Sequence, residues 1–337
     1  MTKHPDLSKY FRHLVFLEPG GHQEFIGWQE DQPIVTIERQ EQEVWQRRGP
    51  DGHLLAEWAL PSSKPADRRI NLKHTQQVAA CLAPGPPDAV LFFNQALPVV
   101  SFGLERPFGI SLTNLSSNKL GHSWLGHQYN RGGAWRPVWG MLSRDGSEKW
   151  QRIQGPYTTL PGQEWRGLAS CDNRHYAVAA LNHKDGLLFC RDNRGHLLWK
   201  QSLPGLYPFC VAIVQQQLWV AGRQESRESL VLQIWDHQGR CQSSSTLSVP
   251  GVPDVWIDQI LPDPREGAWL LGCQGDPFRG LAAKVEPSGQ RLDIQAFRTK
   301  GCILRCGRWD GAALWVGGQM FDAQVPQVFW GQLAGVS

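Results

Sequence analysis

With 337 residues, of which 41% are hydrophobic, the chain is long and apolar enough to bury a sizeable core. Lys and Arg outnumber Asp and Glu by only 34 to 31, and the resulting charge of +3 is too small to indicate a nucleic-acid or membrane partner. Residues 1–21 lack the apolar run of a signal peptide, and the 8 cysteines show no paired spacing. We therefore expect a cytoplasmic protein with reduced cysteines.

A turn followed by a hydrophobic strand recurs along the chain. The turn glycines are Gly52, Gly146, Gly195, Gly239 and Gly289. Their successive spacings are 94, 49, 44 and 50 residues, and since 94 is twice 47, one weakly marked copy lies between the first two. This period is typical of the four-stranded blades of a β-propeller, in which a short hairpin turn needs a residue that tolerates positive φ.

Two further marks accompany the turn. Trp219, Trp269 and Trp315 each stand three residues before a glycine, in LWVAG, AWLLG and ALWVGG. Leu-Pro or Val-Pro pairs follow the turn strand, where proline ends the outer strand because it cannot continue a sheet ladder. In residues 205–250 these marks define four strands: FCVAIV, QQLWVAG, LVLQIWD and RCQSSSTLSV.

The last copy contains only three strands, CILRCGRW, ALWVGGQ and QVFWGQLAG. The segment FRHLVFLEPGG near the N-terminus has the outer-strand pattern, so we predict that residues 11–18 pair with residues 327–333 as the closing strand and leave no open sheet edge. The sequence thus predicts an all-β chain in which residues 1–337 form a single β-propeller of seven four-stranded blades. Two separate β domains are the alternative, which no linker-like segment supports.

Residues 84–140 are the least regular part of the pattern. QVAACLA, AVLFFNQ and PVVSFGL are strand candidates in and just before this region, and the segment that follows them is rich in Gly, Ser and Asn. A propeller of six blades with an insertion is therefore the alternative to seven blades. In that case residues 104–135 form an insertion able to bind a partner.

Several copies resemble bacterial propeller repeats. CRDNRGHLLWK is similar to the tryptophan-docking repeat of quinoproteins, GAWLLGCQGDPFRGLAAKVEPSGQRLD is similar to a delta-60 or SBBP-type repeat, and IWDHQG is similar to a WD40 strand. Quinoprotein dehydrogenases carry a vicinal disulfide and a calcium site, whereas this chain has no adjacent pair of cysteines. The quinoprotein-like resemblance therefore implies the fold and not an activity.

Two pairs of residues have the side chains of a metal or disulfide site. His122 and His127 are five residues apart, which places them on opposite faces of a strand and is a poor chelating step on a helix, so we interpret them as polar loop residues. Cys302 and Cys306 share one face of a strand but lie about 13 Å apart at roughly 3.3 Å per residue, too far for a disulfide or a shared metal. We interpret them as core residues, and we expect neither a metal nor another cofactor.

The strongest functional signal is a set of loop residues. In a propeller, the connections from each outer strand to the next inner strand, and from each second strand to the third, emerge on the same side. Arg and aromatic residues, which dominate protein interfaces, recur in these connections. The predicted binding face comprises Arg68, Arg69, Trp165, Arg166, Tyr207, Trp256, Arg223, Arg227, Phe278, Arg279 and Phe321.

This face favours a non-catalytic propeller that binds a protein or peptide, as a scaffold, subunit or accessory factor of a larger complex. The alternative is a small-ligand enzyme, a lyase or hydrolase, with its site at the mouth of the central channel. Its candidate acid, base or metal-binding groups are Asp254, Asp258, His183 and Glu24. Glycan binding through surface tryptophans is the least favoured hypothesis, because most tryptophans lie at strand positions that should be buried.

Overall fold

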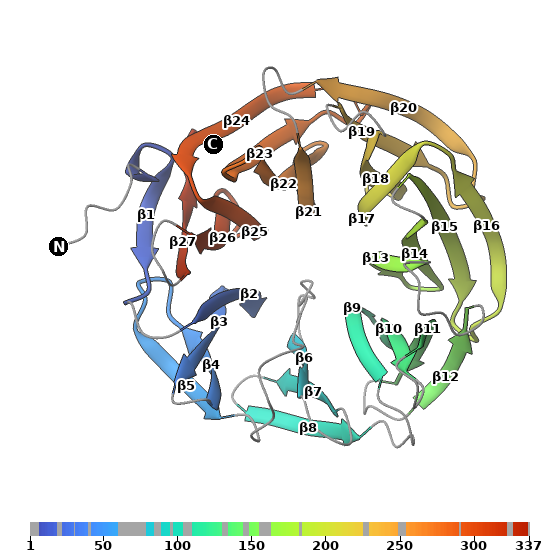
Figure 1. The fold of residues 1–337 in the computed structure, drawn as a ribbon, viewed down its shortest axis with the longest axis horizontal. Helices are drawn as coiled ribbons and strands as arrows, with labels where there is room; N and C mark the ends of the chain where they lie inside the picture. Colours follow the sequence, from blue (N-terminus) through green and yellow to red (C-terminus); the bar gives the residue numbers. More distant parts are fainter. Residues whose placement is uncertain are drawn as a thin grey trace. The chain divides into compact units, whose positions relative to one another are not determined.

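The computed structural model describes residues 7–18, 22–29, 31–39, 42–59, 79–83, 89–94, 97–103, 110–129, 134–143, 148–154, 163–181, 184–224, 229–248, 254–289, 291–321 and 326–335. Apart from the short 3-10 helix η1 (Leu7–Lys9), every helix or strand in these residues is a β-strand (Figure 1). They contain no helix long and apolar enough to cross a membrane. The chain divides into two compact units, residues 1–60, 227–230 and 245–337, and residues 61–226 and 231–244.

Among the described residues, the first unit contains three four-stranded antiparallel sheets, with strand orders β2-β3-β4-β5, β21-β22-β23-β24 and β1-β27-β26-β25. Their strands are β1 (Phe11–Phe16), β2 (Gln23–Gln29), β3 (Gln32–Arg39), β4 (Gln42–Arg48), β5 (Leu54–Ala59), β21 (Val255–Pro262), β22 (Ala268–Gln274), β23 (Arg279–Val285), β24 (Arg291–Lys300), β25 (Cys302–Trp309), β26 (Leu314–Met320) and β27 (Gln327–Leu333).

The second unit contains the sheets β6-β7-β8, β9-β10-β11-β12 and β13-β14-β15-β16, and most of the sheet β17-β18-β19-β20. The strands are β6 (Ala79–Ala83), β7 (Ala89–Asn94), β8 (Leu97–Gly103), β9 (Ile110–Asn118), β10 (Gly121–Tyr129), β11 (Trp135–Leu142), β12 (Glu148–Ile153), β13 (Glu164–Cys171), β14 (Arg174–Leu181), β15 (Asp185–Asp192), β16 (Leu197–Leu203), β17 (Leu206–Val214), β18 (Gln217–Gln224), β19 (Ser229–Trp235) and β20 (Cys241–Ser248).

The N-terminal strand completes the last sheet. β1 pairs antiparallel with β27, with Phe11 opposite Leu333 and Phe16 opposite Phe329. The ring of Phe11 packs edge-on against Phe329 and Phe297, at centroid distances of 5.6 and 5.4 Å. The pairing predicted for residues 11–18 and 327–333 is therefore confirmed, and burial of aromatic rings holds the two ends of the chain together.

The irregular region of the sequence forms ordinary strands. QVAACLA, AVLFFNQ and PVVSFGL correspond to β6, β7 and β8, a sheet that has three strands among the described residues. Residues 110–118 and 121–129 of the expected insertion are β9 and β10, so the insertion hypothesis is wrong for this part of 104–135. A polar side chain of β10 can be buried because it has a hydrogen-bond partner: the indole Nε1 of Trp139 donates to Ser123 Oγ at 2.8 Å.

The turn glycines adopt the predicted left-handed conformation. Their φ angles are 95° at Gly52, 81° at Gly195, 83° at Gly239 and 81° at Gly289. An aspartate before the turn accepts hydrogen bonds from its backbone, as Asp192 Oδ1 does from the backbone nitrogen of Arg194 at 2.9 Å. Gly146 lies outside the described residues.

Tryptophans on outer strands attach to the turn of the following sheet. In the second unit, Trp150 on β12 donates its indole Nε1 to the carbonyl oxygen of Asn193 at 2.9 Å. Trp199 on β16 repeats this contact with the carbonyl oxygen of His237 at 3.0 Å. Each ring lies against the turn glycine, where a Cβ atom would come within 3 Å of it. The segment that resembles a tryptophan-docking repeat therefore takes part in contacts of this kind.

Among the described residues, a β-bulge recurs on the innermost strand of every four-stranded sheet, whereas β6 pairs with β7 without one. The extra residues include Ile26, Arg166, Phe209, Asp258 and Arg305. The bulge explains the predicted Trp-x-x-Gly mark, because it brings a carbonyl of the inner strand over the second strand. A Cβ on Gly272 would lie 1.9 Å from Trp256 O, and one on Gly318 would lie 2.1 Å from Ile303 O, so only glycine fits.

The same bulge corrects the interpretation of Cys302 and Cys306. Both are buried, as predicted, but the extra residue Arg305 turns them to opposite faces of β25. Cys302 packs in one apolar cluster with Leu304, and Cys306 packs in another with Phe25. Strict alternation predicted a shared face, and a bulge shifts that alternation by one residue.

Candidate functional site

The described residues include most of the predicted binding face. Arg68, Arg69 and Arg227, together with the candidate catalytic residue His183, lie outside them. The others fall into a cluster around Tyr207 in the second unit and a pair of phenylalanines in the first. Trp256 belongs to neither, because its indole Nε1 donates to Asp258 Oδ1 at 3.1 Å along β21.

The Tyr207 cluster comprises Glu164, Arg166, Tyr207 and Arg223. Tyr207, near the start of β17, is 4% exposed and pairs in register with Arg223 near the end of β18. The Cζ atoms of Arg166 and Arg223 lie 5.0 and 4.9 Å from the centre of its ring. Two guanidinium groups thus contact one aromatic ring, an arrangement in which the π electrons of the ring favour both cations.

Arg166 owes its position to the bulge in β13. As the extra residue opposite β14, it donates to the carboxylate of Glu164 and to the hydroxyl oxygen of Tyr207. Burial raises the pKa of Tyr207, and the nearby arginines act in the opposite direction. The cluster holds two cations and one anion, and among the described residues Arg223 forms no ion pair. The cluster therefore carries an excess positive charge at the ends of β13, β17 and β18.

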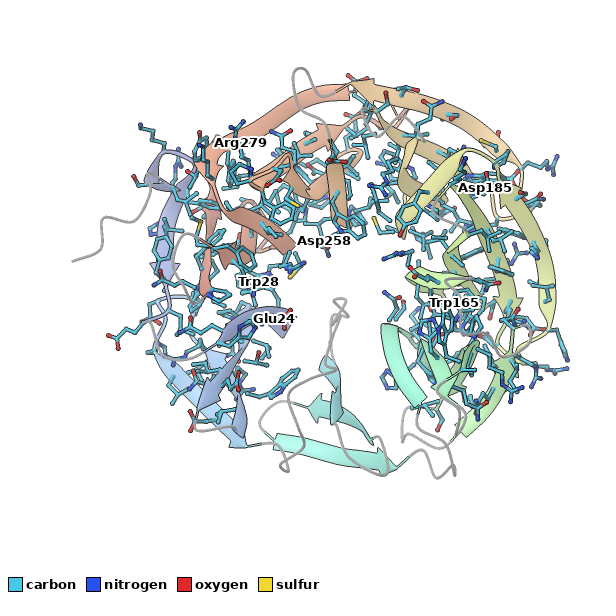
Figure 2. All side chains as sticks on the ribbon, in the orientation of Figure 1. Glu24, Trp28, Trp165, Asp185, Asp258 and Arg279 are labelled. Atoms are coloured by element: carbon cyan, nitrogen blue, oxygen red, sulfur yellow. The ribbon has the colours of Figure 1, made fainter. Side chains whose placement is uncertain are left out.

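Trp165 does not belong to the exposed part of this cluster. It is 4% exposed and packs edge-on against Trp139 and Phe189, at centroid distances of 5.9 and 5.5 Å (Figure 2). Alternation along β13 turns Trp165 into the core. Its ring therefore packs in the core, and it makes none of the contacts that join Arg166, Tyr207 and Arg223.

His122 and His127 are strand residues and not loop residues. Both lie on β10, where His122 is buried and His127 stacks edge-on with Trp135 at 4.5 Å. Burial, with a smaller effect from Arg166, lowers the pKa of His127 to about 4, so this side chain is neutral at physiological pH. In the described part of the chain, no three His, Cys, Asp or Glu side chains come together as metal ligands would.

The phenylalanine pair, which we define as Phe278 and Phe321, lies at the ends of two adjacent sheets. Phe278 precedes β23 and is 50% exposed, and Phe321 follows β26 and is 40% exposed. Both are tied to the backbone at the start of β25: Cys302 N donates to Phe278 O at 3.2 Å, and Phe321 N donates to Gly301 O, just before the strand, at 2.7 Å. The pair is therefore fixed on the backbone while its rings remain accessible.

Arg279 adjoins this pair at the start of β23. Its Nε is buried and has no hydrogen-bond partner among the described residues. An exposed aromatic pair beside a guanidinium is the composition that recurs at the centre of protein interfaces.

The candidate catalytic carboxylates are separated by their contacts. Asp258, the bulge residue of β21, accepts from Arg305 at 3.5 Å, and Arg305 in turn donates from Nε to Gln319 Oε1 at 3.0 Å. Asp254 is exposed, with a positive φ of 60°. Figure 2 shows Glu24 and Asp258 on the innermost strands of their respective sheets. The ion pair commits Asp258 to the fold, and no contact joins it to Glu24 or Asp254 among those described.

Sequence reasoning missed Arg305 and Gln319. Arg305 contacts both Asp258, 47 positions before it, and Gln319. β25 pairs with β26 in one sheet, and β21 contacts β25 from the adjacent sheet, so only the fold brings these three residues together. The bulge spacing is the signal that places Arg305 and Asp258 at equivalent positions of successive blades.

No protein-family model and no curated protein matches the sequence. Among solved structures, the β-propeller domain of Cps50 (Swd1) from Myceliophteria thermophila has a TM-score of 0.60 at 8% identity, covering 94% of this chain and 98% of that one. BBS1N, in its complex with ARL6DN, has a TM-score of 0.53 at 10% identity and covers 97% and 93%. The acylaminoacyl peptidase of Pyrococcus horikoshii has a TM-score of 0.55 at 7% identity and covers 93% of this chain but 52% of that one.

At these identities the likeness is one of fold alone. It agrees with the sheet pairing, in which four-stranded antiparallel sheets follow one another along the chain and β1 completes the last of them. The chain is a β-propeller.

Proposed function

We propose that this β-propeller is a non-catalytic protein that binds a protein or peptide through the ends of its blades. The observation that carries the proposal is the phenylalanine pair. Of the large hydrophobic side chains that are exposed in the described residues, only Phe278 and Phe321 are aromatic. Each is anchored by a backbone hydrogen bond, Phe278 to Cys302 and Phe321 to Gly301. Exposed aromatic side chains in fixed positions are the groups that contribute most to protein interfaces.

The Tyr207 cluster supports the same function in the second unit. Arg166 and Arg223 are held against one ring, so little side-chain entropy remains to be lost when they contact a partner. Of the structural neighbours, BBS1N is seen in a complex with ARL6DN, which supports protein binding as a use of this fold.

Capture from a lysate of the native host tests the proposal. The full chain is immobilised as wild type, as Phe278→Ser with Phe321→Ser, and as Arg166→Ala with Arg223→Ala, and the retained proteins are quantified by mass spectrometry. The matched control is Leu197→Ser with Leu198→Ser, because these two side chains are each 47% exposed but lie on the outer strand β16.

We expect the wild type and the control to retain the same discrete set of proteins, and at least one of the two blade-end variants to lose it. Circular dichroism and thermal melting confirm that each variant is folded. Retention of the same proteins by both blade-end variants would contradict the proposal.

A further inference from the structure

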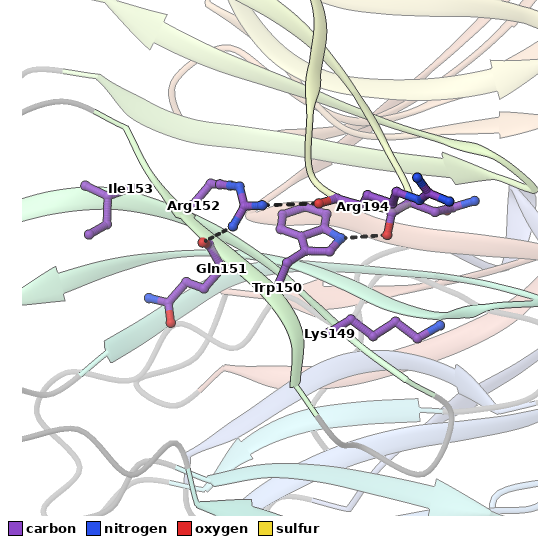
Figure 3. A pocket seen from close by; sticks show the side chains of 7 residues that line it. Lys149, Trp150, Gln151, Arg152, Ile153 and Arg194 are labelled. Atoms are coloured by element: carbon purple, nitrogen blue, oxygen red, sulfur yellow. Dashed lines mark hydrogen bonds between the residues drawn. The ribbon is translucent and has the colours of Figure 1, made fainter.

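A cationic groove lies on the outer side of the second unit, and none of its lining residues belongs to the Tyr207 cluster or to the phenylalanine pair. Its volume is about 530 Å³, and Figure 3 shows it between β12 and the turn that joins β15 to β16. The lining residues are Lys149, Trp150, Gln151, Arg152, Ile153, Asn193 and Arg194.

The groove has a fixed floor. Trp150 bonds to the carbonyl oxygen of Asn193, and Arg152 donates from Nη2 to the carbonyl oxygen of Arg194 at 3.2 Å and from Nη1 to that of Gln151 at 3.0 Å (Figure 3). These contacts join the strand to the turn, so the charged groups have defined positions before any ligand arrives. A preformed site loses less entropy on binding.

The charge of the groove is uncompensated in the described part of the chain. Lys149 donates to the carbonyl oxygen of Leu120 at 2.6 Å, and Arg152 bonds only to carbonyl oxygens. None of the ion pairs formed among the described residues involves Lys149, Arg152 or Arg194. Three cations therefore line the groove without a described ion pair, and the one acidic group in the turn, Asp192, accepts from the backbone nitrogen of Arg194 at 2.9 Å. This excess of positive charge favours a negatively charged ligand.

The next blade provides an internal comparison. Trp199 docks on the turn of His237 as Trp150 docks on that of Asn193, so the two grooves have the same scaffold. Counting from the docking tryptophan and the turn glycine, the equivalents of Lys149, Arg152 and Arg194 are Leu198, Gln201 and Gln238. Because the second docking forms without these three cations, the scaffold does not require them, and a ligand is a better explanation of their presence.

The shape of the site favours an extended peptide. Among the described residues, β12 is the end strand of the sheet β12-β11-β10-β9 and has a strand neighbour on one side only. An added strand could pair with its open edge and place alternate side chains along the groove. A single-stranded nucleic acid would need an exposed ring for base stacking, but Trp150 is only 5% exposed.

We propose that this groove binds an acidic, extended peptide segment of a partner protein, whose carboxylates contact Lys149, Arg152 and Arg194 while its backbone pairs with the outer edge of β12. The site is separate from the blade-end residues, so it goes beyond the function proposed above. Its test does not depend on the capture experiment.

Fluorescence anisotropy of the full chain with a labelled peptide tests the groove. The probe is a short fluorescein-labelled peptide in which glutamate alternates with threonine, and the comparison probes are its lysine–threonine counterpart and a fluorescein-labelled single-stranded oligonucleotide. The variant Arg152→Gln with Arg194→Gln gives the groove the glutamines found at positions 201 and 238. The reciprocal change, Gln201→Arg with Gln238→Arg in that variant, places the two cations in the next groove.

We expect the glutamate peptide to bind the wild type, to bind roughly three- to tenfold more weakly to the double variant, and to weaken as salt is added. The reciprocal change should restore part of the binding. Failure of the wild type to bind the glutamate peptide, equal affinity of wild type and double variant, or tighter binding of the lysine peptide or the oligonucleotide would overturn the proposal. Thermal melting of each variant verifies that the fold is intact.

Discussion

The same backbone device, a bulge on an innermost strand, has different consequences in the two units. In the first unit the bulges of β21 and β25 present Asp258 and Arg305, which form an ion pair with each other. In the second unit the bulge of β13 presents Arg166, which contacts Glu164 and the ring of Tyr207, where Arg223 adds a second cation.

The difference separates residues that hold the fold from residues suited to binding. Asp258 and Arg305 balance each other's charge, so the pair leaves little net field for a ligand. The Tyr207 cluster has one more cation than anions at the blade ends. A recurring bulge thus places a side chain at the same point of several blades, and we propose that the identity of that side chain decides whether the position stabilises the fold or contributes to binding.

Acid should lower the stability of the second unit, and this is the largest effect that we predict. His175 is fully buried, with Nδ1 at 2.9 Å from Ser170 Oγ and Nε2 at 2.9 Å from Asn193 Oδ1, and burial lowers its pKa to about 4. Between pH 6.5 and 4 the unfolded chain binds a proton that the folded chain does not, so stability is complete above about pH 6.5 and falls as the pH drops to 4.

For each buried histidine this amounts to about 3 kcal/mol, and His127 contributes in the same direction. Urea unfolding at pH 7 and pH 4.5 measures the loss of unfolding free energy. In His175→Gln only the contribution of His127 remains, so the loss due to the two histidines should fall by about half. An unchanged pH dependence in this variant would show that His175 titrates normally.

Gly272→Ala should make a side chain collide with the backbone beside the bulge of β21. The new Cβ would lie 1.9 Å from the carbonyl oxygen of Trp256, a backbone atom that cannot rotate away, so we expect a loss of about 2–3 kcal/mol in the free energy of unfolding. The control is Gly205→Ala, where no atom lies within 4 Å and only the positive φ of 68° costs about 1 kcal/mol. Equal losses from the two variants in urea unfolding would contradict the role assigned to the bulge.

Asp258→Ala should destabilise the fold without affecting binding. The change leaves Arg305 without its ionic partner and the indole of Trp256 without its acceptor, which we expect to lower the free energy of unfolding by about 1–2 kcal/mol. Denaturant unfolding measures the loss, and capture of partners by the same variant should equal that of the wild type. A variant as stable as the wild type but unable to capture partners would reverse the assignment of the two regions.

Arg223→Ala should have the smallest effect on stability. The guanidinium contacts the ring of Tyr207 and takes part in no described ion pair, so its loss should change the free energy of unfolding by less than about 1 kcal/mol. Isothermal unfolding measures this change. A loss comparable to that of Asp258→Ala would place Arg223 among the residues that hold the fold.

The sequence predicted the features that depend on local pattern. The turn glycines, the four strands in residues 205–250 and the pairing of residues 11–18 with 327–333 follow from periodicity, because a β-turn requires particular residues and an outer strand has a recognisable end. The regular strands β9 and β10 were not predicted, since serine and asparagine are buried there only with partners that the sequence does not reveal.

The sequence predicted which segments contribute to the candidate site, but not which of their side chains contact one another. Arg166, Tyr207 and Arg223 were expected on one face, and the structure brings them together, whereas Trp165, next to Arg166 on β13, packs against Trp139 and Phe189 instead. Alternation decides which neighbour points inward, and a bulge shifts that alternation without leaving a clear mark in a single sequence. Contacts such as that of Asp258 with Arg305 depend on how adjacent sheets pack against each other and not on local propensity.

Site-specific photo-crosslinking tests the central claim, that the blade ends are the binding surface, most directly. A photo-reactive phenylalanine analogue replaces Phe321, 40% exposed at the end of β26, or Leu198, 47% exposed on the outer strand β16, in otherwise identical chains added to host lysate. We predict a discrete cross-linked product from position 321 and none of the same mass from position 198. Products of equal yield from both positions, or a product from position 198 alone, would contradict the account.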